Sequence, residues 1–427
     1  MKTILSLGAT ALATPLICGL SSANEVPSVS PIVWDTEVET VEASAPKPES
    51  EPIKLIISAD AIYTAAGDMI EGGTIAIAGT TIVAVTPGGV SSEEDGLHVA
   101  AITPGFIDLS PRINLADFSV EESSEVVPYL RATDAMDLYD PRWERLLKSG
   151  TTCVLISPAA EDVVGGMTSI IKTGGEELLE SREVLADAML AGSFGSHASR
   201  GNAPVRGRPT DHFARRPTTR MGTEWSHRKA FYDTLAAMSY EDRKFEGWEI
   251  MASVLKGERP YIVQASATQD IRTAIYLKEE FNIPNMVVDA AAESWREPGL
   301  LARSGMSVVL PPFSAMGRTA IDNGFLSWNC AKTLSDLGVP FALSSHGSAT
   351  PSGRLAMQAG YAIRGGLSFE DALASVTITP ARLAGVDSRV GSLEVGKDAD
   401  LVLWSGKPFA ATSRVVGVVI NGELVTQ

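Results

Sequence analysis

The sequence predicts an α/β fold, in which a (β/α)8 TIM-type barrel is joined to a small β-sandwich domain formed by the N- and C-terminal segments. The middle of the chain alternates strand-like apolar runs with amphipathic helical segments, and both ends carry short β-type runs separated by turn residues. The 427 residues are too many for one ordinary core. About 280 residues of strand–helix units lie between the two ends, which is the length that an eight-stranded barrel needs.

Helix and strand signals alternate along the barrel segment. Asp140 is placed to cap a helix that has Pro141 at its first position and stops at Gly150, and the strand 151–157 follows. Further signals are the apolar helix face of Ile271, Ile275 and Phe281, the buried strands 285–289 and 305–310, the capping box of Ser368 and Asp371, and the helix opened by Thr379 and Pro380.

The two chain ends share a different texture. Their strand-like runs are 55–57, 74–77, 81–85, 400–404, 415–420 and 424–425. Asn421-Gly422 between the last two runs is typical of a hairpin turn. We therefore expect segments 54–103 and 387–427 to form the β-sandwich, with the barrel over 104–386 between them.

The N-terminus has the pattern of an export signal. Residues 1–23 begin with a basic residue, continue through the largely apolar stretch 4–20 and end in small residues, which predicts a signal peptide. Segment 24–53 is acidic and rich in proline, so we expect an extended linker. The mature protein is then periplasmic or secreted, without a membrane span. Lipidation at Cys18 stays an alternative, although Ile17 before it is large for such a site.

Composition limits the class of protein. The net charge of −17 and the pI near 4.8 exclude nucleic acid as a partner, because phosphate binding needs a dominant basic surface. Cys153 and Cys330 are the cysteines of the mature chain, and both lie in apolar or strand-like stretches. We expect buried free thiols rather than a disulfide.

Two separated motifs carry a family resemblance. Residues 102–108 (ITPGFID) and 391–402 (GSLEVGKDADLV), with 379–382 (TPAR) shortly before the second motif, resemble the amidohydrolase superfamily, the group of imidazolonepropionase and dihydroorotase. The likeness runs from about residue 55 to residue 425 and implies the barrel-plus-sandwich fold. The stretches 165–172 and 219–222 are similar to a narrower group of exported, imidazolonepropionase-like members.

The resemblance also implies a metal site at the C-terminal mouth of the barrel, held by a His-x-His pair, further histidines and a terminal Asp. At the matching positions this chain carries Ser110 and Arg112, then Gln264 and Ser266, then Ala290, and finally Ser345 or His346, depending on the register. Serine is a weak ligand, and arginine is a permanent cation that repels a metal. The chain has five histidines, so no register places four of them at the mouth. We expect no metal or other cofactor, and we assign no catalytic residue.

Two rival metal sites compete with this interpretation. His197, His212 and His227 could form a relocated site, but a Gly/Pro/Arg-rich segment favours solvated loop histidines. An oxygen-rich site for magnesium or calcium could use the remaining acidic residues near the strand ends. Its members would be Asp108, Asp289, Glu293 and His346. We favour neither site, and zinc or another divalent metal would bind only if the degenerate-site interpretation is wrong.

Other charged residues suggest ligand contacts. Some family members carbamylate a barrel lysine, but without metals Lys172 is more simply a structural or ligand-pairing residue. The irregular insertion 190–229 is rich in arginine, and with Arg112 it could clamp a small anionic ligand. The competing explanation is pairing with acidic side chains of the same molecule or of a partner. The candidate ligand-binding residues are Lys172, Arg220, Asp289 and Glu293.

The predicted function follows from the missing histidines. We expect a non-catalytic amidohydrolase homologue that binds a small ligand or acts as the partner of an active relative in a homo- or hetero-oligomer. The alternative is an active hydrolase of carbon–nitrogen bonds other than peptide bonds, such as those of cyclic amides, with an atypical metal site or none.

Overall fold

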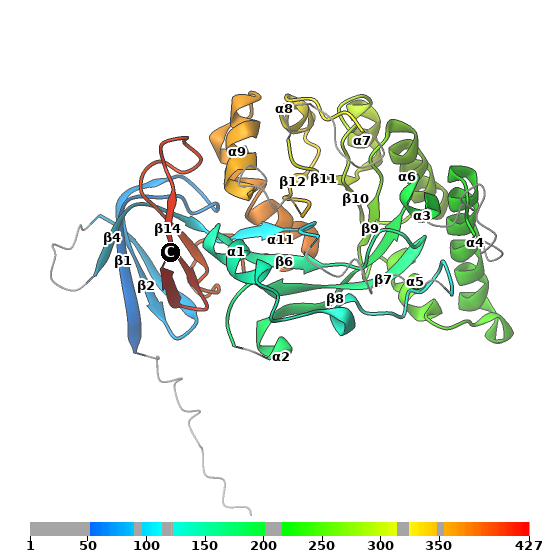
Figure 1. Cartoon of the computed structure of the whole chain (residues 1–427), viewed down its shortest axis with the longest axis horizontal. Coiled ribbons are helices and arrows are strands. Elements are labelled where there is room, and N and C mark those ends of the chain that lie inside the picture. Colours follow the sequence, from blue (N-terminus) through cyan, green and yellow to red (C-terminus); the bar gives the residue numbers. More distant parts are fainter. Residues whose placement is uncertain are drawn as a thin grey trace, which may run out of the picture. The chain divides into compact units, whose positions relative to one another are not determined.

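The computed structural model describes residues 52–88, 96–112, 121, 123–176, 178–200, 216–313, 324–347 and 354–426. The expected signal peptide, Cys18, nearly all of the expected linker and His212 lie outside these ranges. The described strands form two sheets, one of seven strands and one of eight (Figure 1).

The seven-stranded sheet, here called the terminal sheet, joins the two ends of the described chain. In spatial order its strands are β15 (Glu423–Thr426), β14 (Val415–Ile420), β13 (Leu401–Trp404), β4 (Leu97–Pro104), β1 (Ile53–Ile62), β2 (Ile70–Ala78) and β3 (Thr81–Pro87). β4 lies parallel to β1 and antiparallel to β13, so the N-terminal strands pair directly with the C-terminal ones. The predicted hairpin turn between β14 and β15 is confirmed, with Asn421 and Gly422 both at positive φ.

The eight-stranded sheet forms the barrel. Its strands are β5 (Phe106–Asp108), β6 (Thr151–Ile156), β7 (Val164–Lys172), β8 (Glu183–Ser193), β9 (Tyr261–Gln264), β10 (Met286–Asp289), β11 (Ser307–Leu310) and β12 (Phe341–Leu343). Between its first and last strands, the carbonyls of Ser375 and Val376 accept hydrogen bonds from Leu343 and Ile107, each at 2.9 to 3.0 Å. These bonds nearly close the sheet into the predicted barrel.

One part of the barrel departs from strand–helix alternation. β7 is antiparallel to both β6 and β8, whereas β5–β6 and β8 through β12 pair in parallel. The connection from β6 to β7 covers only residues 157–163, which is too short for a helical crossover and forces a reversal of direction. All nine residues of β7 are buried, so this reversed strand belongs to the core.

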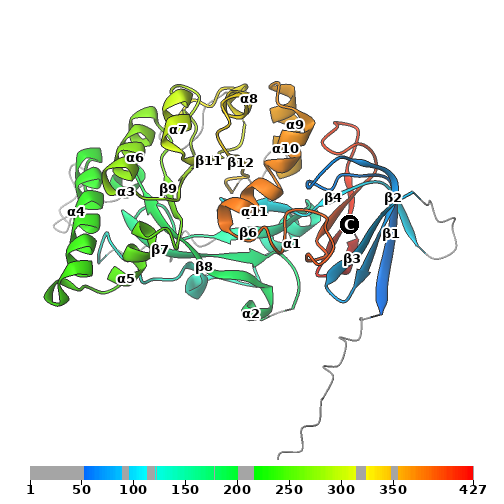
Figure 2. The ribbon, with the colours of Figure 1, turned by 180° about the vertical axis from the view of Figure 1, so that it is seen from behind.

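Helices flank the barrel strands (Figure 2). They are α1 (Arg142–Lys148), α2 (Leu179–Arg182), α3 (His197–Arg200), α4 (Arg220–Ser239), α5 (Trp248–Leu255), α6 (Thr268–Phe281), α7 (Pro298–Ser304), α8 (Cys330–Asp336), α9 (Leu355–Arg364), α10 (Phe369–Ala374) and α11 (Ile378–Ala384). Ser368 caps α10 by accepting a hydrogen bond from the Asp371 amide at 3.0 Å, as predicted. None of these described helices is long and apolar enough to cross a bilayer.

The described parts of the expected irregular insertion, residues 190–200 and 216–229, consist largely of regular secondary structure. β8 runs on to Ser193, and α4 begins at Arg220, so His227 lies in a helix. His227 is fully buried and stacks on Phe194 with ring centroids 4.0 Å apart. The prediction of a solvated loop histidine was therefore wrong at this position. The inner face of α4 carries small polar residues among its apolar ones, so no clear hydrophobic period marked the helix.

Both cysteines of the described chain are buried free thiols, as predicted. Cys153 lies in β6 and Cys330 begins α8. Burial raises the pKa of the Cys330 thiol to about 11, which makes it a poor nucleophile.

Candidate ligand site at the barrel mouth

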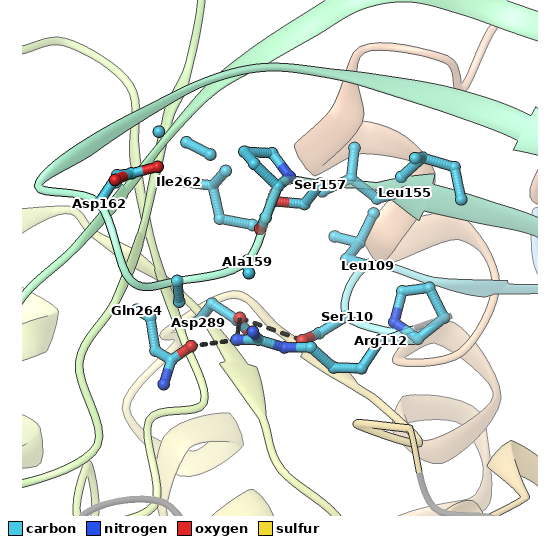
Figure 3. Close-up of a pocket in the computed structure, with 17 residues that line it drawn as sticks. Leu109, Ser110, Arg112, Leu155, Ser157, Ala159, Asp162, Ile262, Gln264 and Asp289 are labelled. Atoms are coloured by element: carbon cyan, nitrogen blue, oxygen red, sulfur yellow. Dashed lines mark hydrogen bonds and ion pairs between the residues drawn. The ribbon is translucent and has the colours of Figure 1, made fainter. Parts of the chain in front are cut away.

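The strand ends bring most of the predicted positions together. Ser110 and Arg112 follow β5, Gln264 ends β9, Asp289 ends β10, and Ser345 and His346 follow β12. The carboxyl ends of parallel strands meet at one edge of a barrel, where loops position functional side chains. Three of these side chains face one another in the close-up of the cavity: Arg112, Gln264 and Asp289 (Figure 3).

Arg112 lies at the centre of this group. Its Nη2 donates to Gln264 Oε1 and, over 3.4 Å, to Asp289 Oδ2 (Figure 3). The side chain of Arg112 is 30% exposed, whereas that of Asp289 is 11% exposed. A permanent cation therefore contacts the carboxylate and the amide oxygen that face the mouth.

Ser110 links Asp289 to His346. Its hydroxyl donates to Asp289 Oδ2 at 3.0 Å and lies 3.1 Å from His346 Nδ1. A hydroxyl has one proton, so Nδ1 of His346 must be the donor in the second bond. Burial, followed by the charges of Arg112 and His197, holds the pKa of His346 well below its usual value. His346 is therefore a neutral donor, and His197 lies within electrostatic range of it.

Asp108 forms a second, fully enclosed part of the site. It accepts hydrogen bonds from the Ser110 amide at 3.0 Å, the Ser345 amide at 3.0 Å and the Ser345 hydroxyl at 2.5 Å. Burial raises the pKa of Asp108 to about 6 in spite of these bonds. Ser345 and His346 are the two candidates for the position of the family's terminal Asp. Both join the cluster, because Ser345 donates to Asp108 and His346 bonds to Ser110.

The backbone is strained around the same group. Arg112, Ala290 and His346 have φ values of 48°, 56° and 44°, in the left-handed region that side-chain-bearing residues rarely adopt. Each such residue costs on the order of 1–3 kcal/mol and persists where the surrounding packing holds it. Gly347 follows at φ 71°, and a Cβ there would come within 2.8 Å of Arg112 Cβ.

The donor set does not fit a divalent metal. No three His, Cys, Asp or Glu side chains converge in ligand geometry within the part of the chain that the structure describes. Ala290 offers no side-chain donor, and Ser110 donates its proton to Asp289. The guanidinium of Arg112 already contacts Asp289, where a metal would be repelled.

Three predicted ligand-binding residues are not brought into this group. Lys172 Nζ lies 2.7 Å from Asp398 Oδ2 and 3.2 Å from Asp400 Oδ2. Both aspartates come just before β13, a strand of the terminal sheet. Arg220 Nε donates to Asp270 at 3.0 Å at the start of α4. Glu293 accepts from the amide and hydroxyl of Thr268, at 3.0 and 2.7 Å, and so caps α6. Lys172, expected to be a structural or ligand-pairing residue, pairs with carboxylates next to the terminal sheet, because the antiparallel strand β7 ends away from the mouth.

A small cavity adjoins Arg112 and Gln264 (Figure 3). Its volume is about 40 Å³, and it is lined by Leu109, Ser110, Pro111, Arg112, Leu155, Ile156, Ser157, Pro158, Ala159, Ala160, Asp162, Gly165, Ala191, Gly192, Ile262, Gln264 and Asp289. Sequence reasoning missed the contribution of segment 155–162. The signal for it was Ser157-Pro158 directly after a fully buried strand, at the edge where such strands place functional loops.

Comparisons with known proteins agree with the geometry. The family model described as "Amidohydrolase family" matches residues 327–425. Amidohydrolase tasK of Hapsidospora irregularis is 25% identical over 355 residues, which are 75% of this chain and 36% of that protein. Imidazolonepropionase of Syntrophobacter fumaroxidans is 38% identical over 92 residues, 21% of this chain and 22% of the relative. The chain thus matches well under half the length of either relative.

A solved structure extends the likeness over the whole fold. The crystal structure of an amidohydrolase from Thermotoga maritima MSB8 has a TM-score of 0.76 and 28% sequence identity, and the match covers 88% of this chain and all of that one. Three observations support the same family. They are the motifs at the two ends of the chain, the barrel joined to a sheet built from both chain ends, and these matches. This chain belongs to the amidohydrolase superfamily.

Proposed function

We propose that this protein is a non-catalytic member of the superfamily whose barrel mouth works without a metal ion. The single observation that carries the proposal is the contact of the Arg112 guanidinium with both Gln264 Oε1 and Asp289 Oδ2. A metal would need those oxygens as ligands. The arginine supplies a positive charge to them that no change of pH in the physiological range removes.

The charge balance supports this proposal. Burial raises the pKa of Asp289, and the Arg112 charge opposes that rise. The Asp289 carboxylate therefore has the Arg112 guanidinium as its counter-ion and needs no cation from solution. A divalent ion brought to the same oxygens would have to displace the guanidinium and also face its charge.

The role that follows is ligand binding or support of an active partner chain. The cavity beside Arg112 supports the first role. The missing histidines support the second, since a chain of this fold without them could stabilise a catalytic relative as a subunit. A partner of this chain would then be a separate amidohydrolase-like chain, and assembly as a homo- or hetero-oligomer is part of the proposal.

The export of the protein is proposed on its N-terminal sequence. The pattern of residues 1–23 supports secretion or transfer to the periplasm, followed by removal of this segment. The N-terminal sequence of the mature protein tests it: a start near residue 24 is expected, and an intact N-terminus on exported protein would contradict it.

Metal content tests the central proposal. The protein, purified without chelator, should contain far less than one zinc per chain by mass spectrometry of the elements. Near-stoichiometric metal would overturn the proposal if it is lost in Asp289→Ala and retained in Asp68→Ala, a matched change at an exposed position between β1 and β2.

Hydrolysis is the second candidate function, because the Asp289 carboxylate lines the cavity and burial raises its pKa, which makes it a stronger base. An enzyme of this kind would hydrolyse a carbon–nitrogen bond other than a peptide bond, such as that of a cyclic amide. Activity that disappears in Asp289→Ala, and survives in Asp68→Ala, would establish it and end the non-catalytic proposal.

A further inference from the structure

Helix α4 has polar side chains among its buried residues and large apolar ones on its exposed face. The buried polar residues are Thr223, Ser226, His227 and Thr234. The outer face carries five large hydrophobic residues that are 42–78% exposed: Met221, Trp225, Tyr232, Leu235 and Met238. A surface helix normally turns its apolar stripe towards the core and its polar residues towards the solvent. Packing within the chain therefore does not account for the apolar residues of this outer face.

The position of α4 leaves its outer face open. The helix lies at the outer edge of the barrel, on the side away from the terminal sheet (Figure 1 and Figure 2). Tyr232 packs edge-on against Phe281 of α6, with ring centroids 4.8 Å apart, and its hydroxyl donates to Glu280 at 2.9 Å. Tyr232 is nevertheless 55% exposed. The contacts with α6 thus hold the helix in place without covering its outer face.

The size of this face matches one side of a protein interface. At about 200 Å² for a large side chain, the five exposed residues leave roughly 500–600 Å² of mostly apolar surface. The largest apolar patch of a typical monomer covers about 300–600 Å². A specific interface covers about 800 Å² on each partner, with an apolar centre and a polar rim. The outer face therefore supplies most of the apolar area that a stable dimer needs.

The order of apolar residues along this face is nearly the same in both directions. Trp225 and Tyr232 lie at equal distances from a midpoint between residues 228 and 229. Met221 and Leu235 each lie about one turn further out. A two-fold axis through the midpoint would place α4 antiparallel on a second copy of itself. Aromatic residues would then meet each other, and Met221 would meet Leu235. A two-fold interface requires such a self-complementary surface.

The charged residues of the face also fit a second copy. Arg228 and Lys229 would lie near the two-fold axis, and each has an acidic partner on its own chain. Arg228 pairs with Glu224 and, at 2.7 Å, with Glu280, and Lys229 pairs with Asp233. The two copies therefore do not bring unbalanced positive charge together. A helix that lies on an anionic membrane is instead rich in lysine and arginine on its polar face, and this chain carries a net charge of −17.

We infer that α4 forms the two-fold interface of a homodimer, in which its outer face packs antiparallel on the same face of a second copy. Trp225 is the anchor of this interface, since it is a large aromatic residue next to the centre. The inference does not depend on a metal-free mouth. It narrows the assembly named in the proposed function to pairing between identical chains.

Sedimentation equilibrium of the mature protein tests the association. The wild type should have the mass of two chains at micromolar concentration. Trp225→Glu places a charge near the centre of the interface and should raise the dissociation constant by about 10-fold or more. Tyr139→Glu changes an aromatic residue that is 78% exposed outside α4, and should leave the dissociation constant unchanged. A monomeric wild type, or equal effects of the two changes, would overturn the inference.

An exchange of charges tests the antiparallel pairing. Met221→Glu and Leu235→Lys each oppose a charge to an apolar side chain of the other copy, so each should weaken the dimer by about 10-fold or more. In the double variant the two new charges face each other across the axis, and the dimer should be about as tight as that of the wild type. The two positions are about 21 Å apart along one helix, so the charges cannot pair within one copy. A double variant as weak as either single one would contradict the pairing.

Cross-linking gives a measurement that disrupts no apolar contact. Lys229→Cys lies beside the axis and should be joined into covalent dimers by a short bismaleimide reagent. Lys332→Cys, at an exposed position of α8, should remain a single chain under the same conditions. Cys153 and Cys330 are buried in both variants. Equal yields of covalent dimer from the two variants would overturn the inference.

Two further outcomes separate the possible explanations. A monomer that binds vesicles of phosphatidylcholine, and loses this binding in Trp225→Glu, would assign the face to a membrane and overturn the inference. A dimer with stoichiometric zinc would leave the inference standing and overturn the proposed function. A metal-free monomer would do the reverse.

Discussion

Two cations of the barrel, Lys172 and Arg112, meet acidic partners in different ways. Lys172 is 2% exposed and is paired with Asp398 and Asp400, and it also donates to Asn421 Oδ1. Burial alone would lower the pKa of Lys172, but the carboxylate of Asp400 and its neighbours raise it, so the lysine stays charged. Arg112 is 30% exposed and shares one nitrogen between an amide and a carboxylate.

The difference separates a cluster in which every donor is paired from one in which donors are left unpaired. Lys172 lies at the end of β7, and its ammonium group has an acceptor for each of its three protons. Arg112 lies beside two other left-handed residues and next to an unpaired amide. A fully satisfied pair ties the barrel to the terminal sheet, whereas strain and unpaired donors mark a functional position.

The largest expected effect comes from breaking the Lys172 cluster. Lys172→Met leaves the buried Asp400 without a cation, while Asp398 keeps Arg389, and we expect a loss of about 3–5 kcal/mol in the free energy of unfolding. Denaturant titration measures it. Lys332→Met, which removes an exposed ion pair with Asp336, is the matched control and should cost at most about 1 kcal/mol. Similar losses in the two variants would show that the buried cluster does not tie the sheets together.

His227 extends the comparison to a buried group that stays neutral. Burial lowers its pKa from 6.5 to about 4, so between these pH values the unfolded chain binds more protons than the folded one. The free energy of unfolding therefore falls as the pH falls through this window, by about 2 kcal/mol at pH 5 from this group. His227→Phe should remove that loss. Asp108, with its raised pKa of about 6, acts in the opposite direction in both proteins and cancels in the comparison. Parallel pH profiles of the two proteins would contradict the prediction.

Removing the mouth cation should cost less than removing Lys172. Arg112→Met takes one ion pair from Asp289, which keeps the Ser110 hydroxyl and the Ala290 amide as donors. We expect a loss of about 1–2 kcal/mol in the free energy of unfolding. A loss as large as that of Lys172→Met would mean that the mouth cluster also holds the fold, and would remove the contrast between the two sites.

The smallest change relieves strain at the mouth. Ala290→Gly at φ 56° removes the Cβ that disfavours the left-handed conformation, and should raise the free energy of unfolding by up to about 1 kcal/mol. Asn282→Gly is the control, since asparagine tolerates the same conformation at φ 50° at the end of α6 and should gain less. Destabilisation by Ala290→Gly would show that the methyl group packs more than it strains.

The sequence by itself determined the family, the fold class and the shortage of histidines for a metal site. The motifs at 102–108 and 391–402 are local patterns, and the capping of α10 by Ser368 depends on residues three positions apart. The shortage of histidines is a matter of composition, which no folding changes. Strand ends also predicted correctly that Ser110, Gln264, Asp289 and Ser345 or His346 would lie near the mouth, because parallel strands end at one edge.

Only the tertiary structure decided which partners these side chains take. Arg112 lies 152 residues from Gln264 and 177 from Asp289 in the chain, so no local pattern specifies their hydrogen bonds. The antiparallel direction of β7 places Lys172 next to the terminal sheet, and His227 is buried against Phe194. Burial, hydrogen-bond direction and pKa depend on segments that meet only in the folded protein, because each is set by what surrounds a side chain rather than by its sequence neighbours.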